Sequence, residues 1–314
     1  MQRDKQGNIA HPRHGQAMGF TLIELLVVIS IIAVVTALLL PSLAGARQQG
    51  RATVCLADLR TLGQGLVMYS TQHRDQFVPG RLPKLDDDNW RALVLGGWKY
   101  RPTFLAMMGT NVAIPPFDDP MSSKGLTDRF GEPGDRQNYA SKVYVCPSVA
   151  HWTDERNGSY GYNYQFLGNS RLRDPSGDPN SFKNWPVTTS QILSPSTTVA
   201  VGDCMGTTAA FPRHQRMPYM NNSRDPRAFG NEGFNLDPPR LDLINGEIAD
   251  RDGYRSAADD RHLGRCNILW VDAHATSMTL EQLGYQVGPD GVIGTNGNNG
   301  LWSLTGRDEA WSQP

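Results

Sequence analysis

The sequence predicts an α+β protein in which a long N-terminal helix packs on a small antiparallel β-sheet head with long loops. The first observation is an apolar run over residues 20–40 that continues into an amphipathic helical pattern. The second is a set of short β-branched and aromatic runs later in the chain, bounded by Gly, Pro, Asn or Asp. The 314 residues are enough for a helix and one large exported domain.

Residues 1–19 form a polar leader that carries three basic residues, Arg3, Lys5 and Arg13, and one acidic residue, Asp4. Basic residues that flank a membrane span keep their end of it in the cytoplasm. We therefore expect a single-pass protein of the bacterial inner membrane. We expect its N-terminus to lie in the cytoplasm and its head in the periplasm or outside the cell.

Residues 20–41 are predicted to form a transmembrane helix. From Phe20 to Leu40, a stretch of 21 residues, the polar members are Thr21, Glu24, Ser30 and Thr36. A helix of this length reaches about 31 Å, the thickness of a bilayer core. The apolar core of a cleaved secretory signal is shorter, about 7–15 residues. A helix that serves only as a membrane anchor does not explain Glu24. Inserting an ionised side chain at mid-span costs about 2.5–3.5 kcal/mol of free energy, so Glu24 should have a partner.

Residues 42–75 are predicted to continue as an amphipathic helix, kinked at Pro41 and ending between 72 and 75. Apolar side chains recur every three or four positions, at Ala52, Cys55, Leu59, Leu62, Leu66 and Tyr69. Gly50, Gly63 and Gly65 each cost about 1 kcal/mol relative to alanine in a helix. Packing must therefore hold this segment in place.

Residues 76–314 are predicted to form the β-rich head. The expected strands lie in 142–147, 159–167, 196–204, 265–273 and 274–280, and 87–98 is expected as a short helix. Asp290 and Gly291 are expected to form a tight turn.

Composition excludes some classes of function. The formal net charge is −1 and no run of Lys or Arg is present, so no nucleic-acid partner is expected. The motifs GxSxG and HExxH and the P-loop are absent, and no enzymatic activity is predicted. The four cysteines, Cys55, Cys146, Cys204 and Cys266, form no CxxC, which argues against a zinc knuckle and permits disulfides in an oxidising compartment.

The segment from Gly19 to Ile29, GFTLIELLVVI, resembles the processing motif of type IV prepilins and type II secretion pseudopilins. The resemblance implies that prepilin peptidase cuts after Gly19 and methylates the new N-terminus at Phe20. It also implies that Glu24 pairs with the N-terminal amine of a neighbouring subunit during assembly.

A second resemblance covers the head. His262 and Asp272 are separated by nine residues, as in the prepilin-type processing-associated H-X9-DG family, a domain of unknown function. The segments CLADLRTLGQGLVMYS, CPS and SYGYN fit the same family. Ala273 departs from it, because the family has glycine there. Glycine suits a turn with positive φ, which alanine adopts reluctantly, so either the turn differs or strain is tolerated.

His262 and Asp272 allow two interpretations. With Asp203, His214 and His274 they suggest a metal-dependent hydrolase. An extended strand, however, would place His262 and Asp272 about 30 Å apart. The alternative is that Asp272 caps the hairpin turn through its own backbone and His262 bonds a loop.

The sequence offers two further candidate sites, one for calcium and one for a disulfide. Asp250 and Asp252 offer carboxylates for calcium, although Asp/Gly clusters are first of all turns, and no other cofactor is expected. Cys55 and Cys146, both in family-like segments, are candidates for a disulfide that pins the helix to the head. The alternative is free buried thiols that pack as small hydrophobes.

The predicted function is that of a pseudopilin or minor-pilin-like structural subunit in a type II secretion or type IV pilus-like assembly. Its expected partners are prepilin peptidase, other subunits contacted through the N-terminal helix, and the inner membrane. The alternative is a tethered ligand-binding, metal-binding or hydrolytic domain that uses the leader for delivery only.

Overall fold

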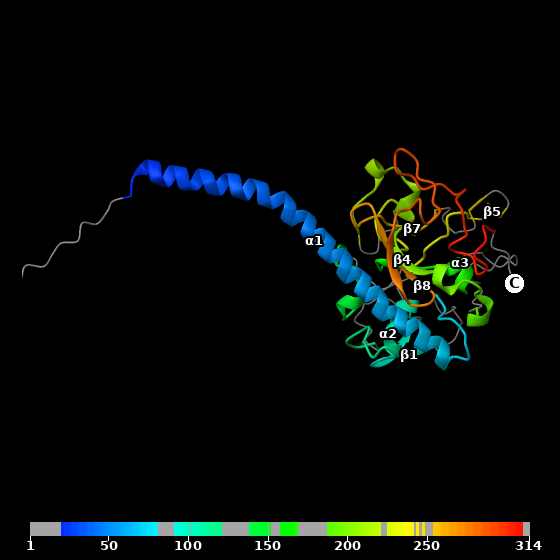
Figure 1. Cartoon of the computed structure of the whole chain (residues 1–314). Coiled ribbons are helices and arrows are strands. Elements are labelled where there is room, and N and C mark those ends of the chain that lie inside the picture. The colour runs from blue at the N-terminus through cyan, green and yellow to red at the C-terminus, as the bar shows by residue number, and fades with distance from the viewer. Residues whose placement is uncertain are drawn as a thin grey trace, which may run out of the picture. The chain divides into compact units, whose positions relative to one another are not determined.

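The structure is a computed structural model, and it falls into two units, Met1–Arg47 and Gln48–Pro314 (Figure 1). The residues that it describes are 20–80, 91–100, 102–120, 138–149, 151, 158–168, 187–220, 225–241, 243–244, 247–248 and 254–309. The predicted α+β class is confirmed, with one long helix followed by small antiparallel sheets.

Helix α1 runs without interruption over Leu22–Gln72. Pro41 lies inside it, so the predicted continuation past the apolar run is confirmed, whereas a kink at Pro41 stays a prediction. The helix ends within the predicted interval. Arg74 and Asp75 have φ values of 55° and 63°, and Asp75 donates its N–H to the carbonyl of Ser70, which turns the chain out of the helix.

The first part of α1 is exposed along its whole length. Every residue from 20 to 51 is exposed, including the apolar side chains of 20–40. Within the described part of the chain, α1 is the one helix long and apolar enough to cross a membrane.

The second part of α1 buries the predicted stripe. Ala52, Cys55, Leu59, Leu62 and Leu66 are buried, as are two of the predicted glycines, Gly63 and Gly65. A β-carbon on Gly63 would lie 2.6 Å from Cδ1 of Leu269. Close packing therefore explains why glycine stands in the middle of this helix, as the sequence required.

The main sheet has five antiparallel strands in the order β3-β4-β8-β9, with β7 also paired to β4. The strands are β3 (Tyr160–Tyr162), β4 (Val199–Gly206), β7 (Ala257–Ala258), β8 (Cys266–Trp270) and β9 (Ala275–Met278). Figure 1 shows β4 and β8 side by side, and their register pairs Gly202 with Ile268. The strands predicted in 196–204, 265–273 and 274–280 are thus confirmed.

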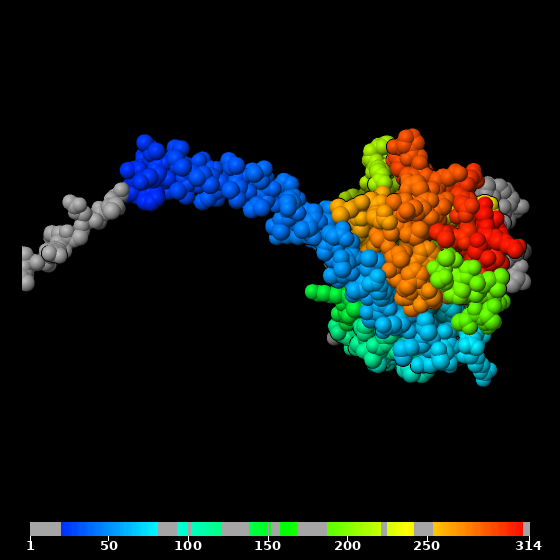
Figure 2. Space-filling view, viewed as in Figure 1, coloured from blue at the N-terminus to red at the C-terminus, as the bar shows by residue number. Residues whose placement is uncertain are grey.

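Side chains of β8 alternate between two cores, as the period of a strand requires. Leu269 joins the core that contains the α1 stripe. Cys266, Ile268 and Trp270 join the second core on the other face, together with Trp302. Figure 2 shows the light-blue end of α1 alongside the orange segment of this hairpin, which agrees with the bond from Arg60 Nη2 to the Ala275 carbonyl at 3.1 Å.

Three predicted elements are corrected. Residues 87–98 do not form a helix in their described part, since β1 (Arg91–Val94) pairs with β2 (Gly97–Tyr100). Gly96 and Gly97 have φ values of 100° and 152°, conformations that make a hairpin turn and break a helix. The segment 142–147 begins as a 3-10 turn because Ser141 Oγ accepts from Val143 N. The segment 159–167 is a strand for three residues and then helix α3 (Tyr164–Leu167).

The remaining elements are short. Helix α2 spans Phe104–Asn111, β5 spans Leu243–Ile244 and β6 spans Glu247–Ile248. The 3-10 turns are η1 (Lys142–Tyr144), η2 (Thr189–Gln191), η3 (Pro195–Thr197), η4 (Thr207–Ala210) and η5 (Arg213–Gln215). The predicted tight turn is present at Gly291, with φ 84° and its N–H bonded to the carbonyl of Gly288.

Candidate functional site

Two features of the chain carry chemistry, and the first is the start of α1. Phe20 is 73% exposed. Thr21 donates its N–H and its hydroxyl to Glu24 Oε2, at 2.8 and 2.7 Å, and Glu24 donates its N–H to Thr21 Oγ1. This reciprocal pair is a capping box, which satisfies backbone donors at the start of a helix. Glu24 therefore has a local structural role in addition to the predicted one.

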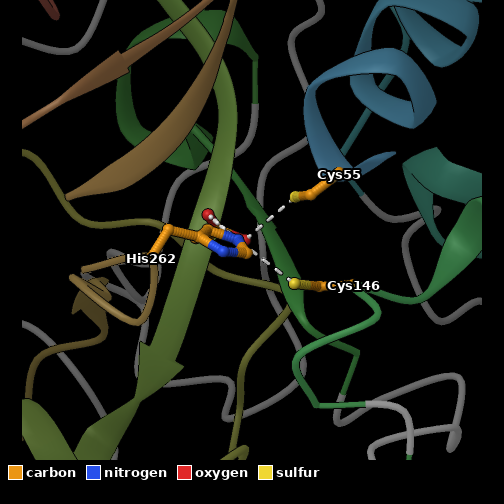
Figure 3. A group of neighbouring side chains, drawn as sticks. Cys55, Cys146 and His262 are labelled. Carbon is orange, nitrogen blue, oxygen red and sulfur yellow. Dashed lines mark hydrogen bonds and ion pairs between the residues drawn. The ribbon is translucent and has the colours of Figure 1, made fainter. Parts of the chain in front are cut away.

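The second feature is a group of four buried side chains in the second unit, which we call the buried cluster. Its members are Cys55 of α1, Cys146 after η1, Asp203 of β4 and His262 before β8. One ligand atom from each lies within 4.8 Å of the others. Figure 3 shows Cys55 and Cys146 approaching His262 from separate elements.

The distances inside the buried cluster are short. His262 Nε2 lies 3.3 Å from Cys146 Sγ and 3.2 Å from Asp203 Oδ2. The Cys55 thiol points to Asp203 Oδ1 at 3.6 Å. The two cysteines and Asp203 have no exposed surface, and His262 is 3% exposed.

Local structure holds each member in place. Leu263 and Gly264 have φ values of 57° and 77°, and His262 and Arg265 exchange both backbone hydrogen bonds, so a type I′ turn fixes His262 at the start of β8. Cys146 donates its N–H to Ser159 Oγ at 2.8 Å. Asp203 Oδ2 accepts the N–H of Asn267 at 2.8 Å.

Charged neighbours surround the buried cluster. Arg261 Nε lies 2.8 Å from Asp259 Oδ2 and 3.9 Å from Asp203 Oδ1. One guanidinium thus faces two buried carboxylates. Burying charge is costly unless it is compensated, and here the two carboxylates and the guanidinium compensate one another.

The pKa values of the members respond to one another. The hydrogen bond from Cys55 lowers the pKa of Cys146 to about 6, against the opposing effect of burial. Burial raises the pKa of Cys55 well above its usual value. Burial lowers the pKa of His262, but the contacts with Asp203 and Cys146 outweigh it and raise this pKa to about 9. Burial raises the pKa of Cys204, outside the cluster, to about 12.

The arrangement does not fit a nucleophilic triad. In such a triad the nucleophile and the carboxylate bond opposite nitrogens of the imidazole. Here Cys146 and Asp203 both approach Nε2, while Nδ1 lies 3.5 Å from Ser148 Oγ. Two sulfurs, one nitrogen and one carboxylate that converge on one place are instead a set of metal ligands.

The structure brings some of the residues predicted from the sequence together and leaves others apart. Cys55 and Cys146 are brought together, but both are free thiols, so the predicted disulfide is not formed in this structure. His262 contacts the loop around Cys146 and Ser148, as its non-catalytic interpretation expected. His262 and Asp272 do not meet through any described contact.

The turn at Asp272 behaves as predicted. Asp272 Oδ1 accepts the backbone N–H of His274 at 3.2 Å, which caps the turn. Ala273 has φ 71°, so of the two predicted alternatives the structure has the turn with strain at alanine.

Other predicted residues lie elsewhere. His214 is exposed on η5. Gly19, Asp250 and Asp252 lie outside the described residues. The predicted cleavage junction and the calcium site therefore stay predictions.

Asp203 was predicted to act only with histidines, and its proximity to Cys55 and Cys146 was not predicted. One signal was available: Asp203 follows the apolar run TTVAVG, and a carboxylate in a buried strand needs a partner. The partners themselves come from segments far apart in the chain, which no local pattern reveals.

Comparison with known proteins identifies the first feature. Residues 19–40 match the prokaryotic N-terminal methylation motif. The chain is also 49% identical over 53 residues to the type IV wide pilus major component PilA4 of Thermus thermophilus, a match that covers 17% of this chain and 40% of the relative. The chain therefore spans less than half of the curated relative that it matches. The search of solved structures found no match to the chain.

These matches settle the character of the N-terminal segment. It is of the prepilin type, as the sequence predicted. The resemblance to the H-X9-DG family stays a prediction.

Proposed function

We propose that this chain, whose N-terminal segment is of the prepilin type, is a pilin-like structural subunit of a pilus or secretion assembly. The finer assignment is to a pseudopilin or minor pilin, processed by prepilin peptidase after Gly19 and methylated at Phe20. In this proposal the chain performs no catalysis of its own.

The uncovered apolar surface of α1 carries the proposal. All side chains from 20 to 51 are exposed in the single chain, and the large apolar ones among them lie in 20–43. Exposed apolar surface of this extent requires lipid or other subunits. The methylation motif over 19–40 supports both environments for this surface. In this proposal the helix lies first in the membrane and then in the core of an assembly.

Glu24 supplies the polar contact between subunits. Cleavage after Gly19 would create an amine at Phe20, and a carboxylate in an apolar environment is stable only when paired. Thr21 donates two hydrogen bonds to the same oxygen, Oε2, so Oε1 is the oxygen we assign to the amine of a neighbouring subunit.

The basic leader supports a cytoplasmic N-terminus, with the second unit on the far side of the inner membrane. The mass and N-terminal sequence of the protein purified from membranes test the processing. We expect a chain that begins with N-methylated Phe20. A chain that begins at Met1, or one cut after residue 40, would overturn the prepilin assignment.

Assembly is tested by a substitution that separates the two roles of Glu24. Glu24→Gln keeps an acceptor oxygen for Thr21 and removes the charge, so the helix start persists while the subunit pair is lost. Ser30→Ala is the matched control, because among the described residues the Ser30 hydroxyl bonds one partner, the Val27 carbonyl in its own helix.

Incorporation of the variants into sheared or crosslinked fibres is the measurement, with processing checked by mass. We expect Glu24→Gln to be processed but excluded from the assembly, and Ser30→Ala to assemble normally. A Glu24→Gln chain with unchanged incorporation would contradict the subunit contact assigned to Glu24. A wild-type chain that never leaves the monomeric state would favour a tethered ligand-binding or metal-binding domain instead.

A further inference from the structure

We propose that the buried cluster of Cys55, Cys146, Asp203 and His262 binds one zinc ion that joins α1 to the sheet of the second unit. The proposal goes beyond the pilin-like function and does not depend on it. It rests on the convergence, the donor chemistry, the burial and the supporting contacts of these four side chains.

The spacing of the donors suits a small tetrahedral ion. Zinc bonds of about 2.3 Å to sulfur and about 2.0–2.2 Å to nitrogen and oxygen place tetrahedral ligands about 3.3–3.8 Å from one another. The separations are 3.3 Å for Cys146 Sγ to His262 Nε2 and 3.6 Å for Cys55 Sγ to Asp203 Oδ1, and all four ligand atoms lie within 4.8 Å of one another. The ligand atoms therefore need little movement to enclose an ion.

The donor types select the metal. Two thiolates disfavour calcium and magnesium, which take oxygen ligands, and mixed sulfur and imidazole donors favour zinc. Four protein donors without access to solvent are typical of a structural rather than a catalytic zinc site. On binding, Zn–S bonds form to Cys55 and Cys146, a Zn–N bond forms to His262 and a Zn–O bond forms to Asp203, and the protons that the thiols and the imidazolium carry pass to water.

Charge argues in the same direction. Arg261 already faces two carboxylates, Asp203 and Asp259, at 3.9 and 2.8 Å. Two cysteine thiolates would add two negative charges to a region without exposed surface. A dication at their centre offsets both, and burying the thiolates without one would be costly.

Contacts around the donors hold them in orientation. Asp203 Oδ2 accepts from Asn267 N at 2.8 Å, which leaves Oδ1, the oxygen nearer to Cys55, as the ligand. Asn267 in turn donates its side-chain amide to the Ala52 carbonyl of α1 at 3.0 Å. Ser148 Oγ lies 3.5 Å from His262 Nδ1, the nitrogen that the metal would not use. Such outer contacts orient metal ligands and raise affinity.

A disulfide is the rival for the same two sulfurs. An exported chain meets oxidising conditions, and Cys55 and Cys146 lie close together. A disulfide gives no role to His262 and Asp203, whereas zinc uses all four side chains.

The experiment measures zinc in the full-length protein, purified in detergent with reductant and without added metal. Elemental analysis should find one zinc per chain. After removal of zinc, cobalt should restore the site and give the visible bands of tetrahedral coordination with sulfur-to-cobalt charge transfer. Chelation should lower the melting temperature, and zinc should restore it.

Variants locate the ion. His262→Ala and Cys146→Ser should each weaken zinc binding by at least tenfold, the lower end of what the loss of an outer contact costs. Cys266→Ser is the matched control: that cysteine is also free and fully buried but lies outside the cluster, and its Sγ donates to the Met278 carbonyl as a hydroxyl can. It should keep one zinc per chain.

One further variant covers the case in which a ligand deletion unfolds the chain. His262→Cys keeps a zinc ligand, so it should bind cobalt with stronger sulfur charge transfer than the wild type. Zinc content unaffected by His262→Ala and Cys146→Ser would overturn the proposal. So would a wild-type chain that carries no zinc, or one that yields a Cys55–Cys146 disulfide in peptide maps of protein purified without reductant.

Discussion

Gly65 of α1 lies directly against the backbone of Met108 in α2, and a β-carbon at position 65 would stand 2.1 Å from the Met108 carbonyl oxygen. Two helices can approach this closely only where one of them lacks a side chain. The contact explains a glycine that helix propensity alone disfavours.

Gly65→Ala should therefore destabilise the second unit, by about 1–3 kcal/mol, because one backbone must move. The matched control is Gly50→Ala in the same helix, where, apart from the neighbouring residues and backbone of the helix itself, no described atom lies within 4 Å of the added carbon. That change should stabilise by up to about 1 kcal/mol through helix propensity. Denaturant unfolding followed by circular dichroism checks both, and equal effects at the two positions would contradict the packing.

Ala273→Gly should stabilise the hairpin turn. Ala273 has φ 71°, a conformation that costs alanine about 1 kcal/mol or more and costs glycine little. Ala275→Gly, two residues on in β9, is the control, since it is buried in the strand and should destabilise. Melting temperatures of the two variants should move in opposite directions. A decrease for both would show that the turn is not strained.

Asp58→Asn should stabilise the protein at alkaline pH. Burial, and secondly the charge of Cys146, raises the pKa of Asp58 to about 6. Because this pKa is higher in the folded state, stability is lost as pH rises from about 4 through about 6. Asparagine removes that loss, so the advantage of the variant should be present at pH 8 and vanish near pH 4.

Asp225→Asn gives the opposite sign as a control. Its hydrogen bonds with Arg227 lower the pKa of Asp225 to about 2. That variant should lose stability near neutral pH and match the wild type in acid. Unfolding curves over this range of pH compare the two, and parallel curves for Asp58→Asn and the wild type would contradict the raised pKa.

Arg255→Lys should destabilise the chain despite keeping the charge. The buried guanidinium donates to the carbonyls of Pro238, Pro239 and Gly294 and lies 5.2 Å over the ring of Tyr285. An ammonium group cannot match this planar fork, and buried carbonyls left unpaired cost about 1–3 kcal/mol each.

Arg265→Lys is the comparison for Arg255, because the Arg265 side chain is half-buried and bonds one backbone carbonyl, that of Ser277, among its described contacts. It should cost less than 1 kcal/mol by the same reasoning. Thermal unfolding of both variants is the measurement. A similar small loss for each would mean that the charge of Arg255, not its shape, is what the core requires.

Patterns with a local cause were predictable from the sequence. The apolar run, the α1 stripe and the hairpin of β8 and β9 all follow from periodicity. At Ala273 the conformational preference of alanine left two alternatives open, a different turn or a strained one. The helix expected over 87–98 was wrong because the turn at Gly96 and Gly97 outweighs the propensity of its neighbours.

The buried cluster lay beyond such patterns. Its four side chains come from α1, a loop after η1, the middle of β4 and a turn before β8. They are brought together by tertiary structure: β4 pairs with β8 in antiparallel fashion, and α1 packs against β8. Cys55 and Cys146 were paired from a family resemblance, whereas Asp203 and His262 needed the tertiary fold.

The packing of α1 against β8 also means that, during synthesis, α1 is made long before the strand that covers it. Residues of α1 such as Gly63 are made early, while Leu269, which closes on Gly63, and Ala275, which bonds Arg60, are made roughly 200 residues later. At about 5–20 residues per second, the delay is roughly 10–40 s. Throughout that time the side of α1 that packs on β8 lacks its native cover, so we expect the nascent chain to depend on a chaperone or on the translocation machinery until its last quarter has emerged.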